Sequence, residues 1–221
     1  MKKIVIIGAT GYVGSAILKE ALGRGHQVKA IVRDPSKLTL IHPHLKVVGG
    51  SVTDTDFLSR ELAKSDAVIS AFNPGWSNPN IGADYSRGAA AIVEAAKAAA
   101  VPYLLVVGGA GSLYVAPGLQ VIDTPDFPRE IYDGADAARR HLADLLPRRD
   151  VNWAFVSPPA RLGADAGFSE AKTGRYRLGQ DDLLLDGDGA AGISVADLAV
   201  AIADDVEQKA HLYSRFTVAS A

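Results

Sequence analysis

"IVIIGATGYVGSAI", residues 4–17, begins as an apolar run, breaks at a cluster of glycines and continues with the spacing of a helix. A short apolar run that ends in glycines is typical of a buried strand, which we place at residues 3–7. Residues 11–24 are expected to form a helix that ends before Gly25, because glycine is common just past a helix C-terminus. A strand, a glycine turn and a helix in this order predict the start of a βαβ unit.

The three glycines of the turn, Gly8, Gly11 and Gly14, have the positions that a dinucleotide requires. The first allows a tight turn, the second lets the backbone approach a pyrophosphate, and the third lets the helix pack closely on the sheet. The helix N-terminus then offers free N–H groups and a positive dipole end to the phosphate. The spacing is G-x-x-G-x-x-G rather than G-x-G-x-x-G. Its place at the first strand-to-helix junction predicts a dinucleotide-binding turn.

The rest of the chain alternates strand-like and helix-like segments. Several apolar runs are continuous, which indicates strands buried on both faces of a parallel sheet that helices cover. We expect strands at residues 27–32, 46–48, 67–71, 103–107, 151–156 and 214–220, a hairpin at 174–189, and helices at 54–63, 82–100, 129–146 and 194–208, with Asp54 and Ser194 as N-caps. These elements predict a Rossmann-like, doubly wound α/β fold in a single domain, residues 1–221. The C-terminal part, residues 157–221, is expected to form a small lobe that contributes to the substrate site.

The composition excludes several classes of function. The chain has 221 residues, a formal net charge of −2 and no cysteine, so disulfides and thiolate chemistry are excluded. The two signs of charge are well mixed, so we expect neither a nucleic-acid partner nor a membrane surface. No signal peptide and no apolar run near the roughly 20 residues of a membrane span are present, so we expect a cytoplasmic protein. His42 and His44 lack the spacing of metal ligands, so no metal site is predicted. The oligomeric state is open between a monomer and a homodimer.

The end of the second predicted strand indicates which dinucleotide is preferred. NAD sites usually have an acidic residue there, whereas a 2′-phosphate favours arginine. Here the strand ends in "AIVRDPSK", with Arg33 at the diagnostic position and Lys37 nearby. A guanidinium can bind phosphate bidentately, although Asp34 could instead face the ribose. We therefore predict NADP(H) in preference to NAD(H).

Six motifs together resemble one family. They are "GATGYVGS" at 8–15, "VRDPSKL" at 32–38, "VVGGAGSLYVAPG" with "DTPDFP" at 106–128, "NWAFVSPPARL" at 152–162, "TGRYRLG" at 173–179 and "ISVADLAVAIADDVE" at 193–207. The chain resembles the atypical short-chain dehydrogenase/reductases, and in particular the small NAD(P)-binding proteins known as NADH-flavin reductases. These are related to biliverdin-IXβ reductase and to the NmrA-like proteins. The first two motifs are shared by many families, and the last four are narrow.

The resemblance implies a set of cofactor contacts along the carboxyl edge of the sheet. They are Gly8, Thr10, Gly11, Tyr12, Val13 and Gly14 at the pyrophosphate, Arg33 at the adenosine phosphate, Ser51 and Val52 beside the adenine, Ala71 and Phe72 near the ribose, Gly108, Gly109 and Ala110 near the nicotinamide, and Ser157 and Pro158 after the sixth strand. Ser51 departs from the family, which usually has an acid there. The family also implies FMN, FAD or riboflavin as substrates.

One common catalytic device of the superfamily is missing. Many members use a Tyr-x-x-x-Lys pair, in which the lysine lowers the pKa of the tyrosine. None of the seven tyrosines is followed four positions later by a lysine. Alcohol dehydrogenation and sugar epimerisation by that route are therefore not expected. Flavin or quinone reduction needs no such pair, because hydride passes to an electron-poor ring and the protons can come from water.

The expected substrate slot lies after the fifth strand. Residues 108–130 have no clear periodicity, and a stretch of this length in a compact domain is usually functional. The candidate catalytic residues are Ser112, as an orienter of substrate or nicotinamide, and Tyr132 and Tyr114, as proton donors or stacking partners. Each has an alternative reading as a turn or packing residue. Phe72 and Trp76 are candidates for the walls of the slot, or are loop residues anchored on the core.

Two functions from different classes follow from these patterns. The first is an NADPH-dependent reductase of a flavin, a quinone or a similar conjugated small molecule. The second is an NADP-binding redox sensor of the NmrA-like type, which signals through a protein partner without turnover. An isomerase that uses the cofactor differently stays open as a third. The resemblance weakens the case for biliverdin, because Ala160 and Arg161 stand where its reductases have a histidine.

Overall fold

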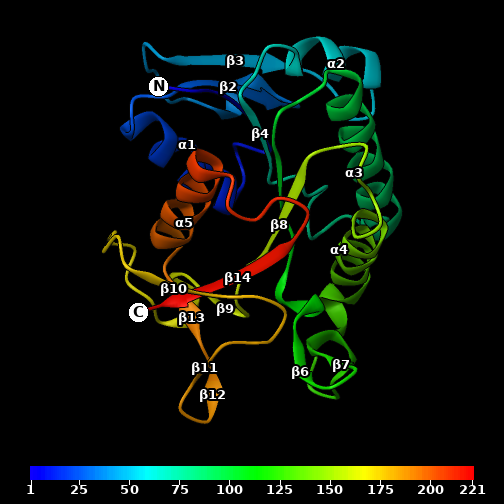
Figure 1. The fold of residues 1–221 in the computed structure, drawn as a ribbon, viewed down its shortest axis with the longest axis vertical. Coiled ribbons are helices and arrows are strands. Elements are labelled where there is room, and N and C mark those ends of the chain that lie inside the picture. Colours follow the sequence, from blue (N-terminus) through cyan, green and yellow to red (C-terminus); the bar gives the residue numbers. More distant parts are fainter.

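A sheet of eight strands organises the chain, and the computed structural model describes residues 1–221 (Figure 1). The strand order is β10-β14-β8-β5-β4-β1-β2-β3. All neighbours are parallel except β10, which runs antiparallel to β14. The strands are β1 (Lys3–Ile7), β2 (Gln27–Val32), β3 (Leu45–Gly49), β4 (Ala67–Ser70), β5 (Leu104–Val107), β8 (Trp153–Ser157), β10 (Tyr176–Gly179) and β14 (Arg215–Ser220). This arrangement confirms the predicted Rossmann-like fold.

Helices cover both faces of the sheet (Figure 1). They are α1 (Tyr12–Gly23), α2 (Thr55–Leu62), α3 (Ile81–Ala98), α4 (Tyr132–Leu145) and α5 (Val195–Gln208). Strand β1 shows why both faces are covered: Ile4 and Ile6 belong to the core under α1 and α5, whereas Val5 and Ile7 belong to the core under α2, α3 and α4. A strand that is apolar on both faces can only lie between two helical layers. None of the helices combines the length and apolar composition that a membrane span requires.

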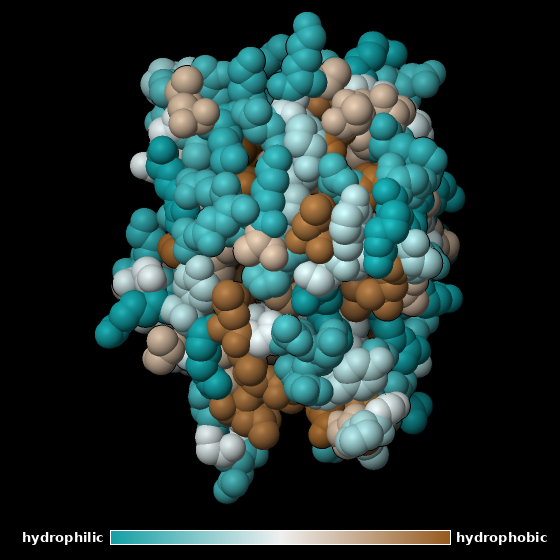
Figure 2. Space-filling model, viewed as in Figure 1, coloured by the Kyte–Doolittle hydropathy of each residue, from teal (hydrophilic) through white to brown (hydrophobic).

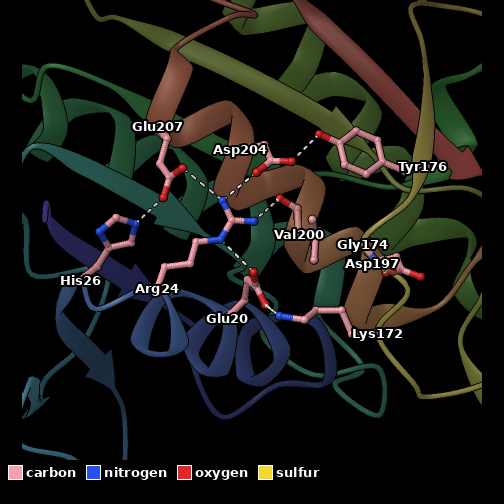
Figure 3. A network of polar contacts seen from close by, with 10 residues as sticks. All are labelled: Glu20, Arg24, His26, Lys172, Gly174, Tyr176, Asp197, Val200, Asp204 and Glu207. Carbon is pink, nitrogen blue, oxygen red and sulfur yellow. Dashed lines mark hydrogen bonds and ion pairs between the residues drawn. The ribbon is translucent and has the colours of Figure 1, made fainter.

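Polar contacts join α1 to α5 (Figure 3). The guanidinium of Arg24 lies 2.8 Å from Glu20 on its own helix and 2.6 Å from Asp204 on α5. Tyr176 of β10 donates to the other oxygen of Asp204 at 2.6 Å. Lys172 lies 3.0 Å from Glu20. The helix that follows the glycine turn is therefore held both by α5 and by the segment before β10.

The topology places a crevice at the carboxyl end of β1. The chain goes from β1 to β2 on one side and later returns to β4 on the other side of β1. The loops after β1 and β4 therefore leave in opposite directions, and ligands of doubly wound sheets bind at such a switch point.

Most predicted elements are confirmed, and two are corrected. Asp54 and Ser194 cap α2 and α5, accepting from N–H groups at 2.9 Å. The predicted hairpin at 174–189 is wrong in its first half, because Tyr176–Gly179 pairs with β14 at the edge of the main sheet. The predicted helix at 129–146 begins later, since residues 129–131 form a 3₁₀ turn. The remaining short strands are β6 (Tyr114–Ala116), β7 (Leu119–Gln120), β9 (Arg161–Leu162), β11 (Leu185–Asp186), β12 (Gly189–Ala190) and β13 (Gly192–Ile193), of which β6–β7 and β11–β12 form small hairpins.

A buried histidine makes the stability of this fold sensitive to acid. His141 of α4 is 8% exposed and packs against the rings of Tyr85 and Phe155. Burial lowers the pKa of His141 to about 4. In the unfolded chain its pKa is about 6.5, so below that pH only the unfolded state binds the proton. The free energy of unfolding should therefore fall by about 3 kcal/mol as the pH drops from about 6.5 to about 4.

Denaturant unfolding at about pH 7 and about pH 4.5 measures this effect. The His141→Phe variant keeps an aromatic ring in the same cluster and removes the titrating group. Its loss of stability over that range should be smaller than that of the natural protein by about 2 kcal/mol or more. Equal losses in the two proteins would contradict the role given to His141.

Candidate functional site

The turn after β1 requires glycine at its first position. Gly8 has a φ of +84°, in the left-handed region that other residues rarely adopt. A Cβ atom at this position would also overlap the carbonyl oxygen of Ala71, which follows β4. The loops after β1 and β4 thus approach each other at backbone distance. This close approach lies at the topological switch point.

Gly11 and Gly14 serve different purposes in the same turn. A Cβ at Gly14 would overlap the carbonyl oxygen of Gly8, so the helix can pack against the turn only without a side chain. A Cβ at Gly11 would lie 3.4 Å from the same oxygen, which is ordinary contact, and Gly11 has an extended conformation with φ −78° and ψ 168°. The protein's own packing therefore does not require glycine at position 11. A ligand that approaches the backbone there would require it.

The N-terminus of α1 has no side-chain cap. Gly11 is the N-cap residue and has no side-chain oxygen to offer to the first turn of this 12-residue helix. The N–H groups of the first turn have no partner within the helix, and with the dipole they form a site for an anion. Thr10 and Tyr12 are exposed beside this turn, while Val13 packs partly against the core.

Tyr12 closes one side of the crevice. Its ring extends from the start of α1 to the loop after β9, and its hydroxyl lies where a Cβ at Gly163 would be. Gly163 has a φ of +76°, so glycine is required there by both conformation and space. Sequence reasoning missed this contact, because nothing in the spacing of the two residues indicates that they meet.

Arg33 lies exposed directly after β2, and its acidic neighbour is already engaged. Asp34 accepts hydrogen bonds from the hydroxyl of Ser36 at 2.7 Å and from the backbone N–H of Ser36 at 3.0 Å. These hydrogen bonds lower the pKa of Asp34, so the carboxylate stays ionised as the cap of a short 3₁₀ turn. Arg33 takes part in no ion pair within the protein. Its guanidinium is therefore available to a phosphate.

Two of the residues expected near adenine and ribose pack against α3. Val52 is buried and Phe72 is half-buried, and both pack where Gly88 of α3 leaves space. Phe72 also stacks on Tyr85, with 6.0 Å between the ring centroids. The Ser51 hydroxyl lies 2.8 Å from that of Thr53 at the surface. Phe72 is thus a ring anchored on the core at the edge of the crevice.

The loops after β5 and β8 meet at two serines. The hydroxyl of Ser112 lies 3.1 Å from that of Ser157, and both residues are nearly fully buried. Gly108 must lack a side chain, because a Cβ there would overlap the ring of Phe155. Gly109 and Ala110 continue the loop at half-buried positions, and Pro158 is buried next to Ser157. The structure therefore brings the expected nicotinamide-side residues together, with the Ser112 hydroxyl pointing into the protein.

Arg215 supports this loop and was missed by sequence reasoning. Its guanidinium donates to the carbonyl oxygen of Ser112 at 2.7 Å and forms an ion pair with Asp181 at 2.5 Å. The guanidinium carbon also lies 5.8 Å from the ring centroid of Tyr114. Arg215 is 6% exposed. One feature of the sequence could have indicated this role: Arg215 stands in the apolar strand that closes the chain. An arginine buried in such a strand needs polar partners.

The two candidate tyrosines differ in their surroundings. Tyr114 is half-buried on β6 and is joined to Ser112 through Arg215. Tyr132 is 40% exposed at the start of α4 and makes an edge contact with Phe127. Trp76 is 57% exposed, and its ring approaches Gly134 near the start of α4. The structure thus connects Ser112 with Tyr114 and places Tyr132 on a different element, at the start of α4 beside Phe127.

Comparison with known proteins places the chain in a family. A family described as NAD(P)H-binding matches residues 8–206. A provisionally named epimerase from Bacteroides thetaiotaomicron is 41% identical with a TM-score of 0.90, over 99% of this chain and 97% of that one. A provisionally named exported protein from Burkholderia pseudomallei is 35% identical with a TM-score of 0.85, over 99% and 100%. A provisionally named NADH-flavin reductase from Streptococcus pneumoniae is 32% identical with a TM-score of 0.85, over the full length of both chains. With its glycine turn and uncapped α1, the chain therefore belongs to the NAD(P)H-binding family of Rossmann-like proteins.

Proposed function

We propose that the protein is an NADPH-dependent reductase that transfers hydride to a flavin, a quinone or a similar conjugated acceptor. The observation that carries the proposal is the glycine turn beside the uncapped α1, with the loops after β5 and β8 joined at Ser112 and Ser157. The name of the relative from Streptococcus pneumoniae supports flavin reduction. A reductase that consumes NADPH depends on the reducing metabolism of the cytoplasm, which is the location we propose.

The choice of NADPH rests on the second strand. Arg33 has no carboxylate partner, so its guanidinium is available to a phosphate, while the ionised Asp34 beside it accepts two hydrogen bonds from Ser36. A 2′-phosphate would be attracted there, whereas NADH would gain nothing from the guanidinium. The name of the relative from Streptococcus pneumoniae gives NADH as its cofactor. The proposed preference for NADPH is therefore a difference between this protein and that relative.

The protein contributes orientation and exclusion of water rather than an acid. When bound, NADPH supplies the hydride, and the reduced flavin takes its proton from water, so that one hydride and one proton are consumed per flavin. The α1 N-terminus holds the diphosphate, and Tyr12 limits its exit toward Gly163. We propose that Ser112 acts as a positioning residue, because its buried hydroxyl and carbonyl fix the loop after β5 through Ser157 and Arg215. Tyr114 and Tyr132 remain proposed contacts of the acceptor.

An absorbance assay tests the proposal directly. Purified protein is mixed with NADPH and then with FMN, riboflavin or a quinone, and the nicotinamide band is followed. We expect the signal to fall only when acceptor is present, at a rate proportional to the protein concentration. The Ser112→Ala variant should bind NADPH normally and turn over more slowly by about tenfold, the effect of one misplaced loop.

The alternative is a sensor that binds the dinucleotide without consuming it. Tight NADPH binding with no oxidation across a broad panel of acceptors would favour the sensor and overturn the reductase. The absence of a Tyr-x-x-x-Lys pair fits both functions. No binding of either dinucleotide would overturn both.

A further inference from the structure

A basic groove lies at the amino ends of the strands, whereas the glycine turn lies at their carboxyl ends. It has a volume of about 420 Å³ and is formed where β1, β2 and β3 begin. Helix α2 has only eight residues, and it ends at Leu62, before it has covered the first residues of these strands. The uncovered sheet is the floor of the groove, and residues 63–65 after α2 form one wall. The surface over the end of the molecule that carries β2 and β3 is largely hydrophilic (Figure 2).

The charges that line this groove are mostly of one sign. Four lysines line it, together with one carboxylate, that of Glu61, although the whole chain has a net charge of −2. Lys29 forms an ion pair with Glu61 at 3.0 Å. No ion pair involves Lys3, Lys46 or Lys64. The groove is therefore lined by three lysines without a carboxylate partner, and His44 is another of its lining residues.

The positions of the lysines are costly for the protein alone. Lys29 and Lys46 are directly opposite each other in the register of β2 and β3. Glu61 compensates the charge of Lys29, whereas Lys46 takes part in no ion pair, so its charge is left without a partner. Lys64 has a φ of +63°, a left-handed conformation that a lysine adopts at a cost in strain. Its turn is fixed by Ser65, whose hydroxyl donates to the carbonyl oxygen of Leu62 at 2.7 Å. The lysines that line the groove without an ion pair are charges that an anion would compensate.

We propose that this groove binds a small, multiply charged anion of the phosphorylated-metabolite class. Its phosphate groups would lie among Lys46, Lys64 and Lys3, while Glu61 keeps Lys29 oriented. A volume of about 420 Å³ is in the range of small-molecule sites. Asp66 accepts the backbone N–H of Lys3 at 2.7 Å and does not itself line the groove. The groove lies at the amino ends of the strands, about 16 Å along β1 from the dinucleotide turn.

Calorimetric titration with inorganic pyrophosphate tests the proposal. Saturating NADP⁺ is present, so that the turn after β1 does not compete for the probe. We expect one binding event that weakens at least about tenfold in the Lys46→Gln variant, because a charge-assisted contact is lost. The Lys19→Gln variant removes the same charge from an exposed position on α1 and should leave the affinity within about twofold.

A second substitution, which removes a negative charge, should change the affinity in the opposite direction. Glu61→Gln removes the one carboxylate of the lining and frees Lys29, so pyrophosphate should bind more tightly by about threefold or more. The absence of heat, equal weakening in Lys46→Gln and Lys19→Gln, or weaker binding in Glu61→Gln would each overturn the proposal. NADP⁺ is titrated separately, so a failure of the dinucleotide site is seen in that experiment and does not affect the comparison of the lysine variants.

Discussion

Gly11→Ala is expected to leave the fold intact and to weaken NADPH binding by about 100-fold or more. The added Cβ would lie 3.4 Å from the carbonyl oxygen of Gly8, and the backbone of Gly11 is already in a region that alanine adopts. Alanine at such a position often stabilises a protein by about 0.4–1 kcal/mol through the unfolded state. The methyl group would instead occupy the space in which a diphosphate approaches the backbone. Calorimetry for binding and thermal unfolding for stability measure the two effects on the same sample.

Gly23→Ala is the matched control for this substitution. Gly23 is the last residue of the same helix, and an added Cβ there would have no atom within 4 Å. Its affinity for NADPH should be that of the natural protein. If Gly11→Ala bound NADPH as tightly as Gly23→Ala, the dinucleotide would not lie across the turn. A large loss of stability in Gly11→Ala would show instead that glycine is needed there for packing.

Arg33→Asp is expected to reverse the preference between the two dinucleotides. Loss of charge-assisted hydrogen bonds to the 2′-phosphate costs about 1.5–3 kcal/mol, and the new carboxylate adds repulsion, so NADPH affinity should fall about 100-fold. NADH has no phosphate there, and its affinity should change by no more than about threefold. Separate titrations with NADPH and NADH give the ratio directly.

Arg175→Asp makes the same change of charge at another exposed position and serves as the control. Arg175 lies in the segment before β10 and takes no part in an ion pair, so both affinities should stay within about twofold. An equal loss of NADPH and NADH affinity in Arg33→Asp would contradict the assignment of the 2′-phosphate. So would an effect on NADPH of similar size in Arg175→Asp, since that would be a general effect of net charge.

The glycine turn after β1 was predictable because its requirements are local. The turn needs glycine at fixed distances in sequence from the end of a strand, and the sequence shows that spacing. The structure gives the reason at two positions: Gly8 has a φ of +84°, and a Cβ at Gly14 would overlap the turn. Capping by Asp54 and Ser194 was predictable for the same reason, since each acts on the helix that follows it. The apolar runs predicted the parallel sheet because strands between two helical layers have no polar face.

The surroundings of the loop after β5 were less predictable because their contacts join distant segments. Arg215 meets the loop of Ser112 from 103 positions away, and Tyr12 meets Gly163 across the crevice. The segment 174–189 resembled one hairpin because its two apolar stretches flank a turn. In the structure Tyr176–Gly179 finds a longer partner in β14, whose edge would otherwise be unpaired. Pairings of this kind depend on which edge the fold leaves open, and local sequence does not encode that.

Calorimetric titration of the natural protein with NADPH and with NADH tests the central claim most directly. A dinucleotide that lies across the turn after β1, with its 2′-phosphate at Arg33, predicts one NADPH per chain, bound at least about tenfold more tightly than NADH. Absence of heat with both dinucleotides, or tighter binding of NADH, would contradict it.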